Sequence, residues 1–199
     1  MKKILLILSV LLICFCLYKI HTKVTIIDIP EGELKWSKTR PSFAKLCVPA
    51  AFSSTKNKVV GVHRINGESY GNDKKYFKKY KVSILDNTFV INRSWQSDNG
   101  FQQIILVKDN KVFDLGNSTK KCIRRALCKN ENNTFLIESN YPMTMTTFAH
   151  YCSKHCSDAI YLDMGEYGYG YVRYGIIFKP LYPLGFFGKH KQTNWLYVE

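Results

Sequence analysis

The chain has 199 residues, with 29 Lys and Arg against 15 Asp and Glu, which gives a formal charge of +14. This length supports one well-packed domain and is short for two. A hydrophobic content of 46% excludes a globally disordered chain, and an aromatic content of 14% favours a strand-rich fold over a helical bundle.

The N-terminus begins with the basic segment Met1-Lys2-Lys3, in which the two lysines carry the charge. The apolar run ILLILSVLLICFCL follows over 4–17. This pattern is typical of a secretory signal peptide or a short signal-anchor. As a helix the run is about 21 Å long, and extending it to Ile20 brings it closer to the bilayer core of about 30 Å. Because no A-x-A pattern follows, we predict an uncleaved anchor over 1–22 that meets the membrane through residues 4–20. Cleavage and secretion are the alternative, and both place the body extracytoplasmically, in the periplasm or cell envelope.

The next segment, 23–42, is predicted to be a linker that starts with a short strand, and 43–199 to be a single domain. Turn residues between apolar stretches predict three β-hairpins in this domain. Their strands are 81–85 with 88–92, 103–108 with 111–115, and 124–128 with 134–138. An Asn66-Gly67 turn follows a further strand near 59–63.

One helix is predicted over 144–157, since threonines at its start offer N-caps and Phe148, Tyr151, Cys152 and His155 recur at helical spacing. Single strands are then expected over 159–162, 171–178 and 194–198. The predicted fold class is therefore α+β. We expect one domain of mixed or antiparallel sheet, built from hairpins with one principal helix and preceded by the N-terminal hydrophobic helix.

The body of the chain holds five cysteines: Cys47, Cys122, Cys128, Cys152 and Cys156. The last two lie four residues apart with histidines nearby, which suggests a metal cluster. A zinc site would need a second ligand pair of recognisable spacing, and the sequence has none. We therefore predict buried thiols or one disulfide, with no metal and no cofactor.

Basic and aromatic residues alternate over 74–81, KKYFKKYK. Such a run could follow a nucleic-acid backbone, or it could be a solvated strand edge on which Lys discourages pairing. Because an exported protein rarely meets nucleic acid, we predict no nucleic-acid partner. An anionic lipid surface or polymer suits the charge better.

The segment with most chemical content is Asp163-Met164-Gly165-Glu166, a glycine-containing loop that follows a buried strand. Loops on a rigid scaffold are common places for functional groups. Two acids three residues apart could share general acid and base roles. The alternative is structural: Asp163 pins the loop and Glu166 is solvated.

The stretches 141–149 and 159–165 resemble the C-terminal core of phosphodiester glycosidase domains, and are most similar to short bacterial members of the Bacteroides type. This is the domain type of the lysosomal enzyme that uncovers mannose phosphate by removing N-acetylglucosamine. Supporting segments, in the expected order, are 48–52, 100–107 and 193–195. Typical members carry an early Asn-Gly-Gly-Phe-type motif and a late Asp-Gly-Gly-Gly-Ser-type motif. Here these positions read Pro49-Ala50-Ala51-Phe52 and Asp163-Met164-Gly165-Glu166, without the Asn and the Ser.

The resemblance implies a protein that hydrolyses or recognises a sugar-1-phosphodiester in an envelope glycan. It implies Asp163 and Glu166 as catalytic carboxylates. The expected substrate-binding residues are His63, Arg64, Gln102, Gly165 and Arg173. Half of the signature is changed, so enzymatic activity is left open. The alternative is a non-catalytic domain of the same scaffold that binds anionic glycans or the envelope.

Overall fold

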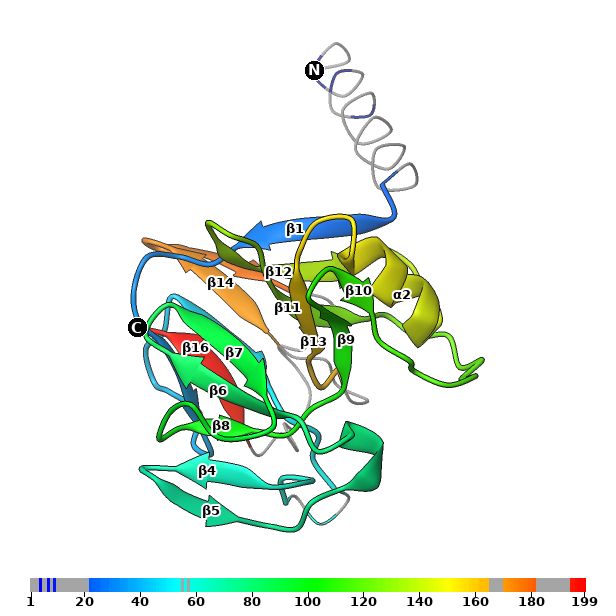
Figure 1. Ribbon diagram of the computed structural model, residues 1–199. Coiled ribbons are helices and arrows are strands. Elements are labelled where there is room, and N and C mark those ends of the chain that lie inside the picture. Colours follow the sequence, from blue (N-terminus) through cyan, green and yellow to red (C-terminus); the bar gives the residue numbers. More distant parts are fainter. Residues whose placement is uncertain are drawn as a thin grey trace.

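The computed structural model describes residues 22–54, 56, 58–164, 170–181 and 194–199, together with the isolated residues 4, 7 and 9. Within these residues the strands form three antiparallel sheets (Figure 1). The first sheet has the order β1 (Val24–Asp28), β12 (Thr134–Ser139), β11 (Arg125–Lys129), β13 (Asp158–Tyr161), β9 (Ile105–Lys108), β10 (Lys111–Val112). The second has the order β15 (Ile177–Pro180), β14 (Tyr171–Tyr174), β3 (Leu46–Pro49), β16 (Trp195–Val198), β2 (Leu34–Ser37). The third has the order β5 (Glu68–Tyr70), β4 (His63–Ile65), β8 (Gly100–Phe101), β6 (Lys81–Leu85), β7 (Thr88–Asn92).

The three predicted hairpins are confirmed as β6–β7, β9–β10 and β11–β12. In the second of them Asp109 and Asn110 take φ values of 51° and 64°. Two-residue hairpin loops of this kind favour Asn and Asp because both central residues need positive φ. The β4–β5 hairpin likewise turns at Asn66-Gly67, as the sequence predicted.

The α+β fold class is wrong: the protein is mostly β-sheet. In the described residues the helices are α2 (Met145–Cys152) and the short 3-10 helix η1 (Lys75–Phe77). The N-cap of α2 is Thr144, whose Oγ1 accepts a hydrogen bond from the Thr147 N–H at 3.1 Å. The helix ends well before residue 157, where the Ser157 N–H donates instead to the Lys129 carbonyl at 2.9 Å; the Ser153 hydroxyl bonds back to the His150 carbonyl at 3.1 Å at the helix end.

Two segments contribute more strand than the sequence predicted. The single strand expected over 171–178 is the hairpin β14–β15, which turns at Gly175 with a φ of 59°, a conformation open to glycine. The segment 24–40, expected as a strand and a linker, supplies both β1 and β2. These strands pair with β12 and β16, so this segment is built into two sheets.

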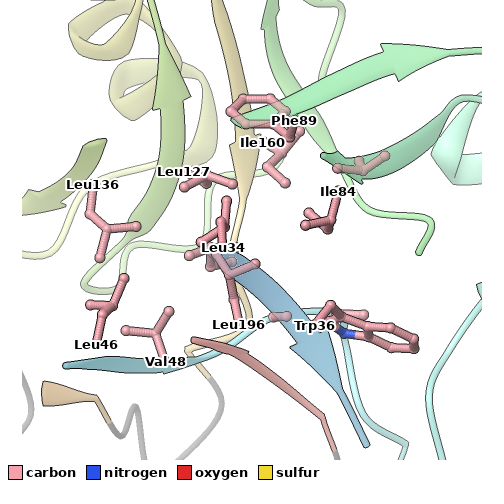
Figure 2. Close-up of a cluster of buried hydrophobic side chains, with 14 of the residues drawn as sticks. Leu34, Trp36, Leu46, Val48, Ile84, Phe89, Leu127, Leu136, Ile160 and Leu196 are labelled. Atoms are coloured by element: carbon pink, nitrogen blue, oxygen red, sulfur yellow. The ribbon is translucent and has the colours of Figure 1, made fainter. Parts of the chain in front are cut away.

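The main hydrophobic core lies where the three sheets meet, and Figure 2 shows side chains from all of them in one cluster. A second cluster lies between the first sheet and α2, which covers one side of that sheet in Figure 1. Alternation along β11 explains the two clusters, because Leu127 faces the main core while Ala126 and Cys128 face the helix side.

The hydrophobic helix predicted before the domain falls on residues 1–22, nearly all of them outside the described residues, so the prediction has no support from the structure. None of the helices in the described ranges is long and apolar enough to span a bilayer. The division into anchor, linker and domain stays a prediction.

Candidate functional site

Asp163 lies two residues beyond the end of β13 and is 7% exposed. Its backbone N–H donates to the Ala50 carbonyl at 2.9 Å. Its Oδ2 accepts a hydrogen bond from the Ser53 N–H at 3.0 Å. These two bonds join the loop after β13 to the loop after β3, although the bonded residues are more than a hundred positions apart in the chain.

Buried amide side chains hold the loop after β3 in place. The Asn194 Oδ1 accepts from the Ala51 N–H at 2.6 Å and from the Trp36 indole at 3.2 Å. The Asn194 Nδ2 donates to the Ala51 carbonyl at 2.9 Å, and the Gln103 Nε2 donates to the Ala50 carbonyl at 3.1 Å. Both alanines are fully buried. The loop is therefore fixed by hydrogen bonds at positions where no larger side chain has room.

Gln102, expected to bind substrate, is fully buried and bonds inside the protein. Its Oε1 accepts from the Val62 N–H at 2.9 Å, and its Nε2 donates to Asp73 Oδ1 at 2.7 Å. The backbone N–H of Gln102 also donates to the Val62 carbonyl at 2.9 Å. This side chain therefore fastens the segment before β4 to the segment that follows β8.

His63, on β4, is 5% exposed and lies in an aromatic setting. Its ring stacks on Tyr70 at 5.7 Å and meets the edge of Trp36 at 5.8 Å. Within the described part of the chain neither ring nitrogen has a hydrogen-bond partner. Burial, with a contribution from the charge of Lys38, lowers the pKa of His63 below its ordinary value of 6.5, and outweighs an opposing contribution from the Gly61 backbone. The neutral imidazole is therefore the favoured form.

The two predicted arginines do not converge on Asp163. Arg64 is held in its own hairpin, where Nε donates to the Gly67 carbonyl at 2.9 Å. The Arg173 backbone bonds to Lys45 at the start of β3, whereas Asp163 bonds to Ala50 beyond its end. At about 3.3 Å per residue these two points on β3 lie about 16 Å apart. Gly165 and Glu166 lie outside the described residues.

Sequence reasoning missed a buried ion pair on β11 and β12, beside the strand that leads to Asp163. Arg125 is fully buried, and its Nε and Nη2 donate to the Glu138 Oε2 at 2.9 and 2.6 Å. The Arg125 carbonyl accepts from the Leu162 N–H at 2.9 Å, so the pair lies beside the residue before Asp163. A Cβ on Gly170 would come within 2.9 Å of the Arg125 guanidinium, which explains a glycine at this close approach. The sequence contained one indication of this pair, because the register of the β11–β12 hairpin places the two charged residues opposite each other.

Aromatic side chains pack beside the site, beginning with Phe52, the residue before Ser53. Its ring lies 5.6 Å from Tyr161 and stacks on Phe77 at 6.3 Å. Phe77 also lines a pocket of about 380 Å³, whose other walls include Ile104, Phe113, Leu115 and Met145. The surroundings of the early loop are thus apolar on the side of η1.

The cysteines in the body are free thiols: Cys47, Cys128, Cys152 and Cys156 are buried and Cys122 is half-buried. Burial beside Cys152 and Cys156 raises the pKa of Cys128 well above its usual range, which makes a reactive thiolate unfavourable there. In the described part of the chain no group of three or more His, Cys, Asp or Glu side chains is placed to hold a metal ion.

No family model matches the sequence, and no curated protein matches it either. Among solved structures, the fold is similar to that of the zebrafish N-acetylglucosamine-1-phosphodiester alpha-N-acetylglucosaminidase catalytic domain, auto-inhibited by its pro-peptide. The two chains are 11% identical and superpose with a TM-score of 0.58, over 88% of this chain and 82% of that one. The comparison therefore confirms the fold that the sequence resemblance implied, and it concerns the fold alone.

Proposed function

We propose that this protein is a phosphodiester glycosidase-like hydrolase that acts on a sugar-1-phosphodiester in an envelope glycan. The observation that carries the proposal is the junction between Asp163 and the loop at Ala50–Ser53. These are the two chain positions at which the family resemblance places its late and early motifs. Their contact across the fold, together with the likeness to a glycosidase of this type, supports a site at this junction.

The chemistry of the bond indicates which groups the site requires. Breaking the sugar C1–O bond releases a phosphate monoester, whose second pKa of about 6 makes it a good leaving group without strong acid assistance. A carboxylate is required to stabilise positive charge on the sugar ring, or to act as nucleophile or base. Asp163 is our first candidate for that carboxylate, and Glu166 is the second.

Recognition of the phosphate requires a cation or N–H donors. Of the predicted binding groups, His63 is buried and favours its neutral form, so it offers no positive charge. Arg173 is set about 16 Å along β3 from the Asp163 contact by the rise of a strand. We therefore favour the net positive charge of the chain over Arg173 as the source of phosphate affinity.

The location is part of the proposal. The basic start and the apolar run over 4–17 support a membrane anchor with the body outside the cytoplasm, or secretion if the segment is cleaved. The similarity to short bacterial members of the Bacteroides type belongs to the same proposal.

The test is release of free sugar from a synthetic N-acetylglucosamine-1-phosphodiester by the purified full chain. We expect Asp163→Asn to abolish release while the far-UV circular dichroism spectrum is kept, because Asn retains an acceptor for the Ser53 N–H. The matched control is Asp28→Asn, an exposed acid on β1, which should retain full activity. Full activity of Asp163→Asn, or no release by the unaltered chain, would contradict the hydrolase.

A second function is favoured by a specific observation: the early motif lacks its Asn, the late motif lacks its Ser, and the Asp163 carboxylate bonds to Ser53 in the manner of a structural acid. This function is non-catalytic binding of anionic glycans. It predicts binding on a glycan array that weakens as salt is raised, with no turnover.

A further inference from the structure

The hairpin β14–β15 carries a group of exposed apolar side chains at its tip. Ile176 is 96% exposed and Ile177 66% exposed, and Tyr174 and Phe178 beside them are exposed as well. Single exposed apolar residues are ordinary on a protein surface, whereas a contiguous group of large ones marks a contact site.

This tip extends beyond its own sheet. β14 pairs with β3 only through Tyr171 and Val172, and β3 begins at Leu46, the partner of Val172. The residues from Tyr174 to Phe178 therefore lie past the end of β3. Phe43, whose side chain is 79% exposed, lies in the segment just before β3. The apolar group thus projects from the sheet and does not cover it.

Basic residues surround the base of the hairpin. Arg173 precedes the tip and Lys179 follows it, both on the paired part of the hairpin. Lys45, at the start of β3, is joined to Arg173 by a backbone hydrogen bond. The acids Glu33 and Glu199 lie at the same end of this sheet, on its β2–β16 side, where both pair with Lys35.

We propose that the β14–β15 tip inserts into the headgroup region of an anionic lipid bilayer. The apolar side chains at the protruding turn would contact the acyl chains, and the cations at the base of the hairpin would contact the negatively charged headgroups. A second copy of the chain is a poorer occupant, because a symmetric contact would bring the same cations together. In Figure 1 the hairpin tip and β1 lie at the same end of the molecule.

The experiment places a fluorescent probe at the tip of the full chain. Ile177→Trp is incorporated into vesicles of equal parts phosphatidylcholine and phosphatidylglycerol, with and without acyl-chain bromination, and its emission is compared with that of the unaltered chain. We expect the added tryptophan to emit at shorter wavelength and to lose intensity in brominated vesicles. The matched control is Ser69→Trp on β5, an exposed position at the opposite end of the molecule in Figure 1. It should show neither effect.

Quenching of Ile177→Trp that is no greater than that of Ser69→Trp would overturn the proposal. So would quenching that is unchanged in vesicles of phosphatidylcholine alone, since the basic residues would then have no role. A concentration-dependent dimer in sedimentation that the double variant Ile176→Ser with Ile177→Ser abolishes would assign the tip to a second copy and would also overturn it. None of these measurements depends on sugar release, so the hydrolase and the membrane contact stand or fall separately.

Discussion

The two ends of β3 lie in opposite environments. Beyond Pro49 the chain enters a junction where Ala50, Ala51 and Asn194 are almost completely buried and hydrogen bonds join distant segments of the fold. Before Leu46, the neighbouring hairpin carries Ile176 into solvent with almost no contact. The buried end holds polar groups that are hydrogen-bonded out of water, and the exposed end carries apolar side chains into water, so both depart from the usual arrangement. Both departures from the rule are places where a function is expected, one for chemistry and one for attachment.

The largest effect is expected from the charged pair beside the junction. Glu138→Leu leaves the buried Arg125 without this carboxylate, and breaking a buried pair in this way costs about 3–5 kcal/mol of unfolding free energy. Urea denaturation measures the loss. The double variant Arg125→Met with Glu138→Leu should regain most of it, since two apolar side chains leave no uncompensated charge. A single variant as stable as the unaltered chain would contradict the burial of the pair.

A smaller effect is expected from the neutral amide at the junction. Asn194→Ala leaves the Ala51 N–H and carbonyl and the Trp36 indole without this partner, and we expect a loss of about 2–3 kcal/mol of unfolding free energy. The same denaturation experiment measures it. The matched control is Asn132→Ala in the exposed β11–β12 turn, which should change stability little. Equal losses for the two variants would refute the role of Asn194 in fixing the loop.

His63 differs from the polar groups of the junction, because it is buried without a hydrogen-bond partner among the described residues. Its pKa in the folded state is lowered below 6.5, so the unfolded chain binds the proton first as the pH falls. The stabilising contribution of the neutral ring is complete above about pH 6.5 and is lost progressively below it. Thermal unfolding between pH 8 and pH 5 should therefore show a fall in Tm on the acid side.

The control for this prediction is a substitution that removes the titrating group. His63→Phe keeps an aromatic ring between Trp36 and Tyr70 but binds no proton, so it should reduce the acid-side fall in Tm. His150→Gln, at an exposed position on α2, should leave it unchanged. The same acid-side fall in His63→Phe as in the unaltered chain would show that other groups cause it.

The smallest effect is expected at the exposed end. Ile176→Ser with Ile177→Ser removes apolar side chains that contact little in the folded chain, so unfolding free energy should change by no more than about 0.5 kcal/mol. Urea denaturation in the absence of lipid checks this. A loss as large as that of Asn194→Ala would mean that the tip is packed against the protein.

Local pattern was enough to predict the hairpins. Asp86-Asn87 and Asp109-Asn110 lie between alternating apolar residues, and the strands on each side pair as the turn dictates. The predicted helix start at Thr144 was also correct, since a capping hydroxyl acts within one turn. Its end was wrong because a bond from Ser153 to His150 and the pairing of Ser157 with Lys129 override helical spacing.

The site could be predicted only in part, because its geometry depends on bonds between distant segments. The sequence singled out Asp163 and the early loop, and their contact follows from no local rule. It also favoured Arg173, which the strand register places at the far end of β3. It missed Asn194 and Gln103 as loop supports, since an amide on a strand end looks the same whether it faces solvent or a buried carbonyl.

The sequence by itself determined a strand-rich, basic domain with its turns in place and one helix start, because these follow from backbone preferences over a few residues. Only the tertiary structure decided that Arg125 pairs with Glu138 out of water, that Asn194 clamps Ala51, and that Ile176 lies in solvent. Burial is a property of where sheets meet, and it sets the cost of a charge, an amide or an apolar side chain. The chemistry proposed at one end of β3 and the attachment proposed at the other therefore depend on packing that the sequence specifies but does not display.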